Sequence, residues 1–395
     1  MLDSLPLELA TEIFIFTLDS DISDDRLISQ FDASYLCEDG HAWRRVALST
    51  PQLWSNLTLC ETHATNPNPA LIEQWLGRAH LVSLSVWANS FPDTILDLIW
   101  RNNTKWKVLT FQCLGGPAFE LSRINPAGGF PSLRELVINK SDQNIVYDHV
   151  IHGFHNAPRL QEFHVLGCSN FLMAIHIPWA QITRYSCSIP SDSIPTHFGV
   201  NPKSPGNMIP PLLHLKSLTL DSDTCTPTTI LRYLTLPALQ TLDIGFMAIQ
   251  QLETLFTFLT RSSCQLVSFS AGSRETLLEP LIPCLEAMPT LSSLGLAIST
   301  SEEDGSHLLE RLRGDLSLLP RLWDLTIVSN GRLLFPYDLL LETIRARTAL
   351  VPLRRFALLW TSHPGRFYLP DAPLERQLRE TGVDIHFGPH GDISS

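Results

Sequence analysis

The sequence has few charged residues for its length and no long hydrophobic run. Charged residues make up 17% of the 395 residues and apolar residues 44%, a composition that is typical of a folded chain and excludes a disordered one. No apolar run approaches the roughly 20 residues that a membrane-spanning helix needs. The N-terminus lacks the basic and apolar regions of a secretory signal. We therefore expect no membrane association.

Paired cysteines and an excess of basic residues are also absent from the sequence. The eight cysteines are scattered without a Cys-x-x-Cys pair, which predicts reduced thiols and a location in the cytoplasm, the nucleus or both. The net charge of −12 argues against a nucleic-acid-binding surface. No phosphate loop, nucleophile elbow or His-Glu-x-x-His motif is present, so we expect neither an enzyme nor a cofactor.

One short stretch gathers Asp148, His149, His152 and His155, which raises the question of a metal site. His149 and His152 could share a helix face, but no cysteine or glutamate accompanies them and His155 would turn away. We interpret the stretch as a polar outer face and expect no metal there.

An apolar pattern recurs along most of the chain from residue 81. Each unit has an apolar residue, two others, an apolar residue, one other and a last apolar residue. The units are Leu81-Leu84-Val86, Trp106-Leu109-Phe111, Leu133-Leu136-Ile138, Leu160-Phe163-Val165, Ile182-Tyr185-Cys187, Leu215-Leu218-Leu220, Leu239-Leu242-Ile244, Leu266-Phe269-Ala271, Leu291-Leu294-Leu296, Leu322-Leu325-Ile327 and Leu353-Phe356-Leu358. Most successive units begin about 20–30 residues apart, near the period of leucine-rich repeats. In a short strand the second and third apolar residues point inward together, and the first turns in from the preceding loop.

Helical patterns lie between several of these strands. They are Leu252, Leu255, Phe256 and Leu259; Leu308, Leu309, Leu312 and Leu316; and Leu340 and Ile344 with Arg347 facing outward. The pairs Arg311–Arg313 and Arg345–Arg347 are interpreted as solvated helix faces. A helix over Leu374–Leu378 and a strand with Val383, Ile385 and Phe387 should close the array.

The fold class is therefore α/β. We expect residues 81–395 to form a leucine-rich-repeat solenoid, a curved parallel sheet with outer helices. Prolines in Phe130-Pro131-Ser132-Leu133 and in two Leu-Pro-x-Leu segments should end a helix just before the next strand. The proline-rich residues 189–214 predict an irregular loop, either a binding loop or a tolerated insertion.

Two further apolar segments precede the repeats. Residues 4–18, SLPLELATEIFIFTL, place Leu9, Ile13 and Phe16 on one face of a helix that begins near Pro6. Residues 41–59, HAWRRVALSTPQLWSNLTL, contain a second short apolar face.

These residues carry a family resemblance. LPLELATEIF resembles the opening of an F-box, and WRRVALSTPQLWSNL resembles its end in the large fungal F-box/leucine-rich-repeat family. EQWLGRAHLVSLSV, residues 73–86, is similar to the stretch that follows in those proteins. The resemblance is specific over residues 4–18 and 43–59 and only architectural beyond about residue 90.

The resemblance implies a three-helix F-box-like domain in residues 1–60 and a connecting helix or linker in residues 61–80. It further implies insertion of apolar side chains into a Skp-type adaptor, which joins a cullin scaffold. The implied contact residues are Leu5, Pro6, Leu9, Ile13, Leu18, Trp43 and Val46. The chain departs from the family within residues 31–42, where acidic residues and Gly40 interrupt the expected middle helix.

Recognition of an unknown protein target is expected on the concave strand face, because residues that flank the inward positions point out of the sheet. The candidates are Glu135, Glu162, His164, Arg184, Asp221, Asp243, Asp324 and Arg355. The same reasoning places Ala357 there, and the 189–214 loop and the outer helices are alternative sites. The resemblance implies a substrate-recognition subunit of an SCF-type ubiquitin ligase. The alternative is a leucine-rich-repeat interaction scaffold without that role.

Overall fold

A computed structural model describes a large part of the chain and divides it into two units. The described residues are 48, 50–60, 69–87, 97, 99–113, 128–140, 153–166, 176–188, 211–221, 227–272, 278–298, 302–329, 336–347, 353–360 and 372–389. Unit 1 is residues 1–182 and unit 2 is residues 183–395. The boundary between the units falls within residues 81–395, which the repeat pattern assigned to one domain.

The fold is α/β, with an all-parallel open sheet whose strands follow one another in sequence order from β1 to β13. In unit 1 the elements are η2 (Pro51–Trp54), β1 (Asn56–Cys60), α5 (Pro69–Arg78), β2 (Val82–Trp87), β3 (Trp106–Cys113), β4 (Glu135–Lys140), β5 (Glu162–Leu166) and η5 (Trp179–Gln181). In unit 2 they begin with β6 (Arg184–Ser188), β7 (Ser217–Asp221), η7 (Pro227–Arg232), β8 (Thr241–Ile244), η8 (Ile249–Gln251), α7 (Leu252–Ser262) and β9 (Ser268–Gly272). They end with α8 (Leu278–Glu286), β10 (Ser293–Ile298), α9 (Glu302–Gly314), β11 (Asp324–Ser329), α10 (Tyr337–Arg347), β12 (Arg355–Trp360), α11 (Ala372–Glu380) and β13 (Asp384–Pro389).

The apolar repeat predicted the strands β2 to β12 and their buried residues. In each of these strands, the second and third apolar residues of the unit are buried, as Phe163 and Val165 are in β5. The strands pair with the repeat positions in register, so that Leu136 of β4 lies opposite Phe163. Each added strand therefore extends the same apolar layer, which stabilises both neighbours.

The first apolar position is also buried in ten of the eleven units, and Leu81 is the exception. Leu81 is 41% exposed, whereas Val82 is fully buried. The pairing of β2 with β3 has an irregularity between Val82 and Ser83, which places Val82 opposite Trp106. The expectation for Leu81 was wrong because this shift moves the inward position by one residue.

Several strands are preceded by a tight turn that has proline at its second position. In Phe130-Pro131-Ser132-Leu133, the Leu133 amide donates to the Phe130 carbonyl at 3.3 Å. The same bond links the ends of the turns Ala157–Leu160, Leu236–Leu239, Met288–Leu291 and Leu319–Leu322. Proline suits this position because its φ is already fixed near the value that the turn needs. Each turn ends at a leucine, and the turn places the side chain of that leucine in the core.

Strand β1 was not anticipated from the repeat pattern. Its residues Asn56–Cys60 lie inside the range 1–60 that the resemblance assigned to the helical domain. They pair in register with β2, Leu57 lying opposite Leu84, and Leu57 and Leu59 are buried. Residues 56–60 are therefore part of the parallel sheet.

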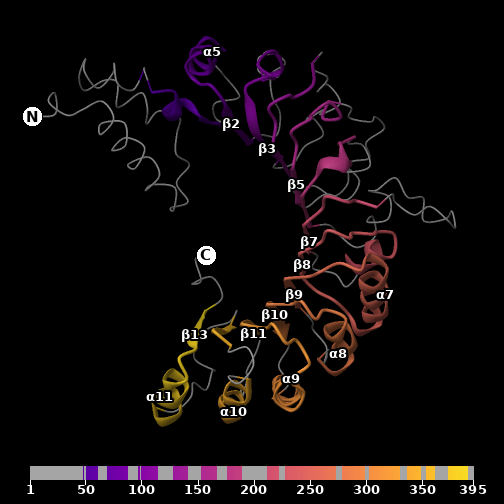
Figure 1. Cartoon of the computed structure of the whole chain (residues 1–395). Coiled ribbons are helices and arrows are strands. Elements are labelled where there is room, and N and C mark those ends of the chain that lie inside the picture. The colour runs from indigo at the N-terminus through magenta and orange to yellow at the C-terminus, as the bar shows by residue number, and fades with distance from the viewer. Residues whose placement is uncertain are drawn as a thin grey trace, which may run out of the picture. The chain divides into compact units, whose positions relative to one another are not determined.

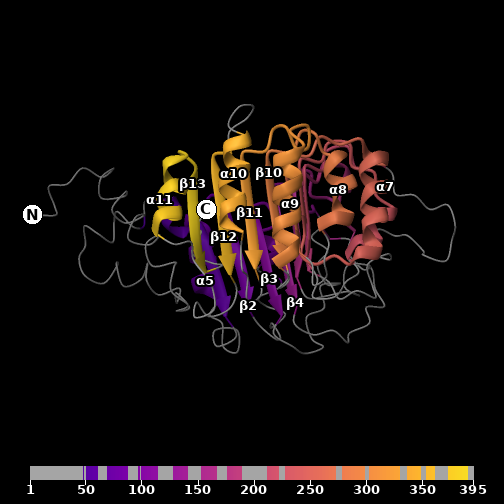
Figure 2. The same cartoon turned by 90° about the horizontal axis from the view of Figure 1, so that it is seen from below.

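The helices of unit 2 lie along one face of its strands, as Figures 1 and 2 show for α7 to α11. Helix α7 buries Leu252, Leu255 and Leu259 as expected, but Phe256 is 43% exposed and Phe258 is buried in its place. Phe256 lies at the rim of the stripe that the other apolar residues form, because successive helical residues are about 100° apart.

Helix α9 ends at Gly314, so Leu316 lies beyond the helix and is exposed, contrary to the helical pattern. The helix α11 and the strand β13 confirm the predicted closing segment. No helix in the described part of the chain is long and apolar enough to cross a membrane.

A long polar side chain often caps the backbone carbonyls of the preceding repeat. In unit 1, Lys105 donates to the carbonyls of Leu76 and Ala79, and Gln181 donates to those of Ala157 and Leu160. In unit 2, Arg261 of α7 donates to the carbonyls of Leu231 and Leu234. These carbonyls lie at turns and at the ends of helical segments, where the capping group supplies a hydrogen-bond donor.

Arg347 is the most buried of these caps and corrects a sequence expectation. It was expected to face outward from α10, but its residue is only 4% exposed. Its guanidinium donates to the carbonyls of Leu312 at 3.1 Å, Leu318 at 3.1 and 3.2 Å, and Leu319 at 2.5 Å. Arg345, two residues earlier, is exposed as expected. A helical pattern alone does not distinguish a solvated arginine from one that caps the end of the neighbouring helix.

Candidate functional site

The strand face opposite the buried layer carries alternating polar side chains. On β5, Glu162 and His164 are partly exposed and alternate with the buried Phe163 and Val165. In unit 2, the same alternation holds on β6, β7, β8 and β11. We call this surface the open face.

All eight predicted target-binding residues lie at partly exposed or exposed positions of its strands: Glu135 on β4, Glu162 and His164 on β5, Arg184 on β6, Asp221 on β7, Asp243 on β8, Asp324 on β11 and Arg355 on β12.

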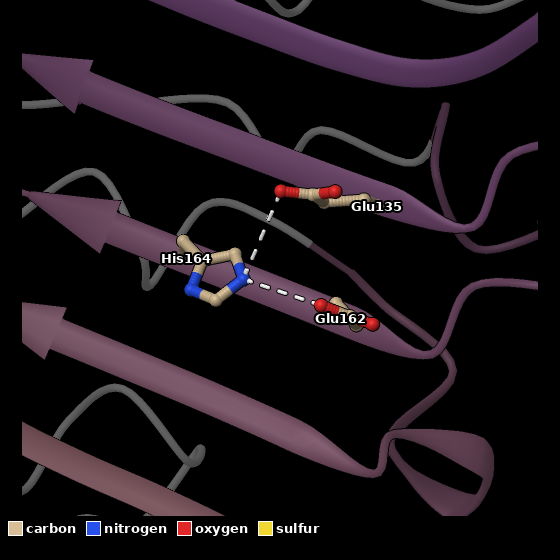
Figure 3. A group of neighbouring side chains, drawn as sticks. All are labelled: Glu135, Glu162 and His164. Carbon is tan, nitrogen blue, oxygen red and sulfur yellow. Dashed lines mark ion pairs between the residues drawn. The ribbon is translucent and has the colours of Figure 1, made fainter. Parts of the chain in front are cut away.

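In unit 1 the open face brings Glu135, Glu162 and His164 together (Figure 3). Glu135 and Glu162 are register partners on the adjacent strands β4 and β5. The His164 Nε2 atom lies 4.0 Å from Glu135 Oε1 and 3.9 Å from Glu162 Oε2. About a quarter to a third of each side chain is exposed. A partly shielded group of two carboxylates and one imidazole can bind a cation or a basic side chain of a partner.

In unit 2 the open face carries an acidic pair on the neighbouring strands β7 and β8. Burial raises the pKa of the Asp243 carboxyl, a hydrogen bond with the Ser270 side chain lowers it, and the charge of Asp221 raises it. Asp221 lies against Gly245, where an added Cβ would meet Asp221 Oδ1 at 2.5 Å. Gly245 thus leaves room for the Asp221 carboxylate. The two carboxylates form a negative patch suited to a basic partner.

Charged residues of both signs occur farther along the same face of unit 2. The Ser293 hydroxyl donates to Asp324 Oδ2 at 3.1 Å, which holds this carboxylate against β10. Asp324 is the register partner of Arg355 on β12. Opposite charges at facing positions of neighbouring strands stabilise the pairing modestly.

The open face does not extend uniformly over β12. Ala357 is fully buried, although the alternation predicted that it would point out of the sheet. Leu359 on the same side is 5% exposed, so both faces of this strand are covered after Arg355. The alternation rule fails here because it fixes the side on which a residue points, not whether that side meets solvent.

A concave feature on the helix side of unit 2 is less suited to a ligand. It is a cavity of about 340 Å³ lined by Arg232, Glu253, Thr254, Thr257 and Arg261. The Arg261 guanidinium already donates to two backbone carbonyls, and Arg232 Nε lies 3.5 Å from the Thr254 hydroxyl. The two arginines therefore mainly hold η7 against α7.

The sequence predicted which residues lie on the open face, but not which of their side chains come close to one another. The convergence of Glu135, Glu162 and His164 depends on the register of β4 with β5, which aligned repeat units could have indicated. Alternation also placed Ser270 on this face without indicating its hydrogen bond to Asp243, and Ser293, which donates to Asp324, was not singled out. Isolated serines in a strand give no sequence signal for such a role.

Several sequence expectations lie outside the described residues. They include all seven predicted adaptor-binding residues, Leu5, Pro6, Leu9, Ile13, Leu18, Trp43 and Val46, together with residues 189–210 of the proline-rich loop. Of the histidine stretch, only His155 is described, and it is exposed.

No protein-family model matches the chain, and no curated protein matches its sequence.

Proposed function

We propose that the chain is the substrate-recognition subunit of an SCF-type ubiquitin ligase, in which the open face binds a protein target. The open face is the observation that supports target binding. Its side chains, such as Glu162 and Asp221, are not required by the apolar layer behind the strands, so their identities are free to specify a partner. The ligase role rests on the F-box resemblance of residues 4–18 and 43–59.

On this proposal the chain positions a target and contributes no catalytic group. Apolar side chains such as Leu5, Pro6 and Leu9 insert into a Skp-type adaptor, which connects the chain to a cullin scaffold. The acidic pair Asp221 and Asp243 attracts a basic patch of the target and helps to orient it. Ubiquitin transfer is then performed by the partner enzymes of the assembly.

A leucine-rich-repeat interaction scaffold without a ligase role is the second candidate. The observation that favours it is strand β1, because Asn56–Cys60 pair with β2 although the F-box resemblance extends through residue 59. The departure within residues 31–42 favours the same candidate. Both candidates use the open face, so they differ in the adaptor and not in target binding.

Charge reversal tests the target-binding half of the proposal. The variant Asp221→Lys/Asp243→Lys is compared with Glu253→Lys/Glu310→Lys, which makes the same charge change on the exposed outer surface of α7 and α9. We expect the first variant to lose proteins that the parent captures from a lysate, whereas the second retains them.

Thermal unfolding of both variants shows whether the loss reflects damage to the fold. Asp221→Lys alone provides a milder variant, because Asp221 is exposed and Asp243 is half-buried. Unchanged capture by the stable double variant would place target binding elsewhere, on the 189–214 loop or the outer helices.

A further inference from the structure

The group of Glu135, Glu162 and His164 in unit 1 has the composition of a metal site. One ligand atom from each residue lies within 4.8 Å of the others. Figure 3 shows the imidazole of His164 beside the two carboxylates, with Nε2 turned toward both. Glu162 and His164 are two residues apart on β5 and so project on the same side, and Glu135 comes from the adjacent β4.

The two glutamates alone form an unfavourable pair. They are register partners on neighbouring strands, and like charges directly opposite one another destabilise a sheet. The apolar layer does not require either carboxylate, because both side chains project from the opposite face. A cation that both carboxylates contact turns this repulsion into attraction.

The donor set and its spacing indicate which cation fits. Calcium and magnesium prefer six or more oxygen ligands, whereas Zn²⁺ accepts imidazole nitrogen and carboxylate oxygen in a four-coordinate shell. With Zn²⁺–ligand bonds of about 2.0–2.2 Å, ligand atoms of a tetrahedral site are roughly 3.3–3.5 Å apart. The 3.9 and 4.0 Å separations at His164 Nε2 are close to this spacing, and small side-chain rotations of the partly exposed glutamates would reach it.

We propose that Glu135, Glu162 and His164 bind one Zn²⁺-like divalent cation through three protein ligands. The remaining coordination position points to the solvent side of the open face, where water or a partner's side chain can occupy it. The neighbouring strands β3, β4 and β5 hold the ligand backbones in one hydrogen-bonded ladder, which orders the site before the ion binds. This inference does not depend on the proposed ligase role.

A titration of the full chain with Zn²⁺ tests the proposal after chelator treatment and dialysis. The chain contains 14 histidines and eight cysteines that can bind zinc weakly elsewhere, so the informative quantity is the difference between variants. Calorimetry is performed on the parent, His164→Ala, Glu135→Gln and Glu162→Gln. We expect the parent to bind one more molar equivalent than each of the three variants, and Mg²⁺ to give no such difference.

Matched controls in the same unit are His80→Ala and Glu73→Gln, which change an exposed histidine and an exposed glutamate far from the group in sequence. Both controls should bind as the parent does. Co²⁺ in place of Zn²⁺ supplies a second readout, since its visible absorption reports the coordination geometry and should be weaker in His164→Ala than in the parent and the two controls.

Circular dichroism without metal establishes that each variant is folded. Equal zinc binding by the parent and His164→Ala would overturn the site and leave an ion-paired histidine. Loss in His164→Ala with full binding in both glutamate variants would overturn the three-ligand arrangement.

Discussion

Each of the two units contains a ladder of parallel strands, but the two units cover their strands differently. In unit 2 the described connections include the helices α7 to α11, which bury leucine-rich stripes against the strands. In unit 1 several described connections use aromatic side chains, with the rings of Phe130 and Phe154 stacked at 5.2 Å and Phe163 and Trp179 6.0 Å apart. The apolar residues of the strands therefore determine how the strands pair. The layer that packs against the strands can be built from helices, as in unit 2, or from aromatic side chains, as in unit 1.

In both units, long polar side chains donate hydrogen bonds to backbone carbonyls at the ends of several described connections. Unit 1 uses Lys105 and Gln181, and unit 2 uses Arg261 and Arg347, to donate to carbonyls of the preceding repeat. The chemistry of the cap differs, but its position relative to the preceding repeat is shared. Substitutions in each unit can measure how much these local structures contribute to the stability of the fold.

The largest effect is expected in unit 2 from Arg347→Met. The substitution removes the donor for the buried carbonyls of Leu312, Leu318 and Leu319 while keeping an apolar stem of similar length. Hydrogen bonds to a charged group each contribute about 1.5–3 kcal/mol, and a buried carbonyl that loses its donor adds a desolvation cost. The Leu319 carbonyl keeps its bond from the Leu322 amide, so this cost concerns the other two carbonyls. We expect the free energy of unfolding in urea to fall by about 3 kcal/mol or more.

Arg345→Met is the matched control on the same helix. Arg345 is exposed and donates to the Gln377 side chain at 3.3 Å, so its loss should change the free energy of unfolding by less than about 0.5 kcal/mol. Similar losses for the two variants would contradict the capping role of Arg347.

A somewhat smaller effect is expected in unit 1 from Gly129→Ala. Gly129 has φ +64° and precedes the turn into β4, and an added Cβ would meet the Asn156 carbonyl oxygen at 2.1 Å. The left-handed conformation and the close backbone contact both oppose any side chain. We expect the free energy of unfolding to fall by about 2 kcal/mol.

Gly77→Ala, in the same unit, is a glycine substitution that should not lower the stability. Gly77 lies in α5 with no atom within 4 Å of an added Cβ, and alanine favours helix by up to about 1 kcal/mol over glycine. The variant should be as stable as the parent or slightly more stable. If both glycine variants lost the same stability, the turn would not be the cause of the Gly129→Ala effect.

The smallest effect concerns the open face of unit 2 and depends on pH. Burial raises the pKa of Asp243, so its contribution to stability is fully present below the unfolded-state value of about 3.9 and is lost as pH rises through the higher folded-state pKa. At pH 7, Asp243→Asn should therefore raise the melting temperature. The gain should disappear near pH 3, where the carboxyl is protonated in both states.

Asp221→Asn tests the smaller cause of the raised pKa. It removes the charge that repels the Asp243 carboxylate and leaves the burial of Asp243 unchanged. Its gain at pH 7 should be smaller than that of Asp243→Asn. A lower melting temperature for Asp243→Asn at pH 7, or an equal gain at both pH values, would contradict this account.

The sequence predicted the ladder well because each repeat places apolar residues at equivalent positions, which the paired strands bury together in register. It failed where a local irregularity or a neighbouring repeat decides the outcome. Leu81 is exposed because the pairing of β2 with β3 is irregular at Val82, and Arg347 is buried because the end of α9 and the turn after it offer it three carbonyls. Ala357 is buried because the second face of β12 is covered.

The candidate site was predictable residue by residue but not as a geometry. Alternation placed Glu135, Glu162 and His164 on one face, yet their separations depend on register and side-chain rotamers that no single strand encodes. The hydrogen bond between Ser293 and Asp324 joins residues 31 positions apart for the same reason.

The most direct test of the proposed function is binding of the purified full chain to a purified Skp-type adaptor. We expect the parent and the Asp221→Lys/Asp243→Lys variant to co-elute with the adaptor, because the open face is separate in sequence from the implied adaptor contacts. Leu5→Ala/Pro6→Ala should abolish co-elution while keeping target capture. Failure of the folded parent to bind, or undiminished binding by Leu5→Ala/Pro6→Ala, would contradict the ligase role as proposed.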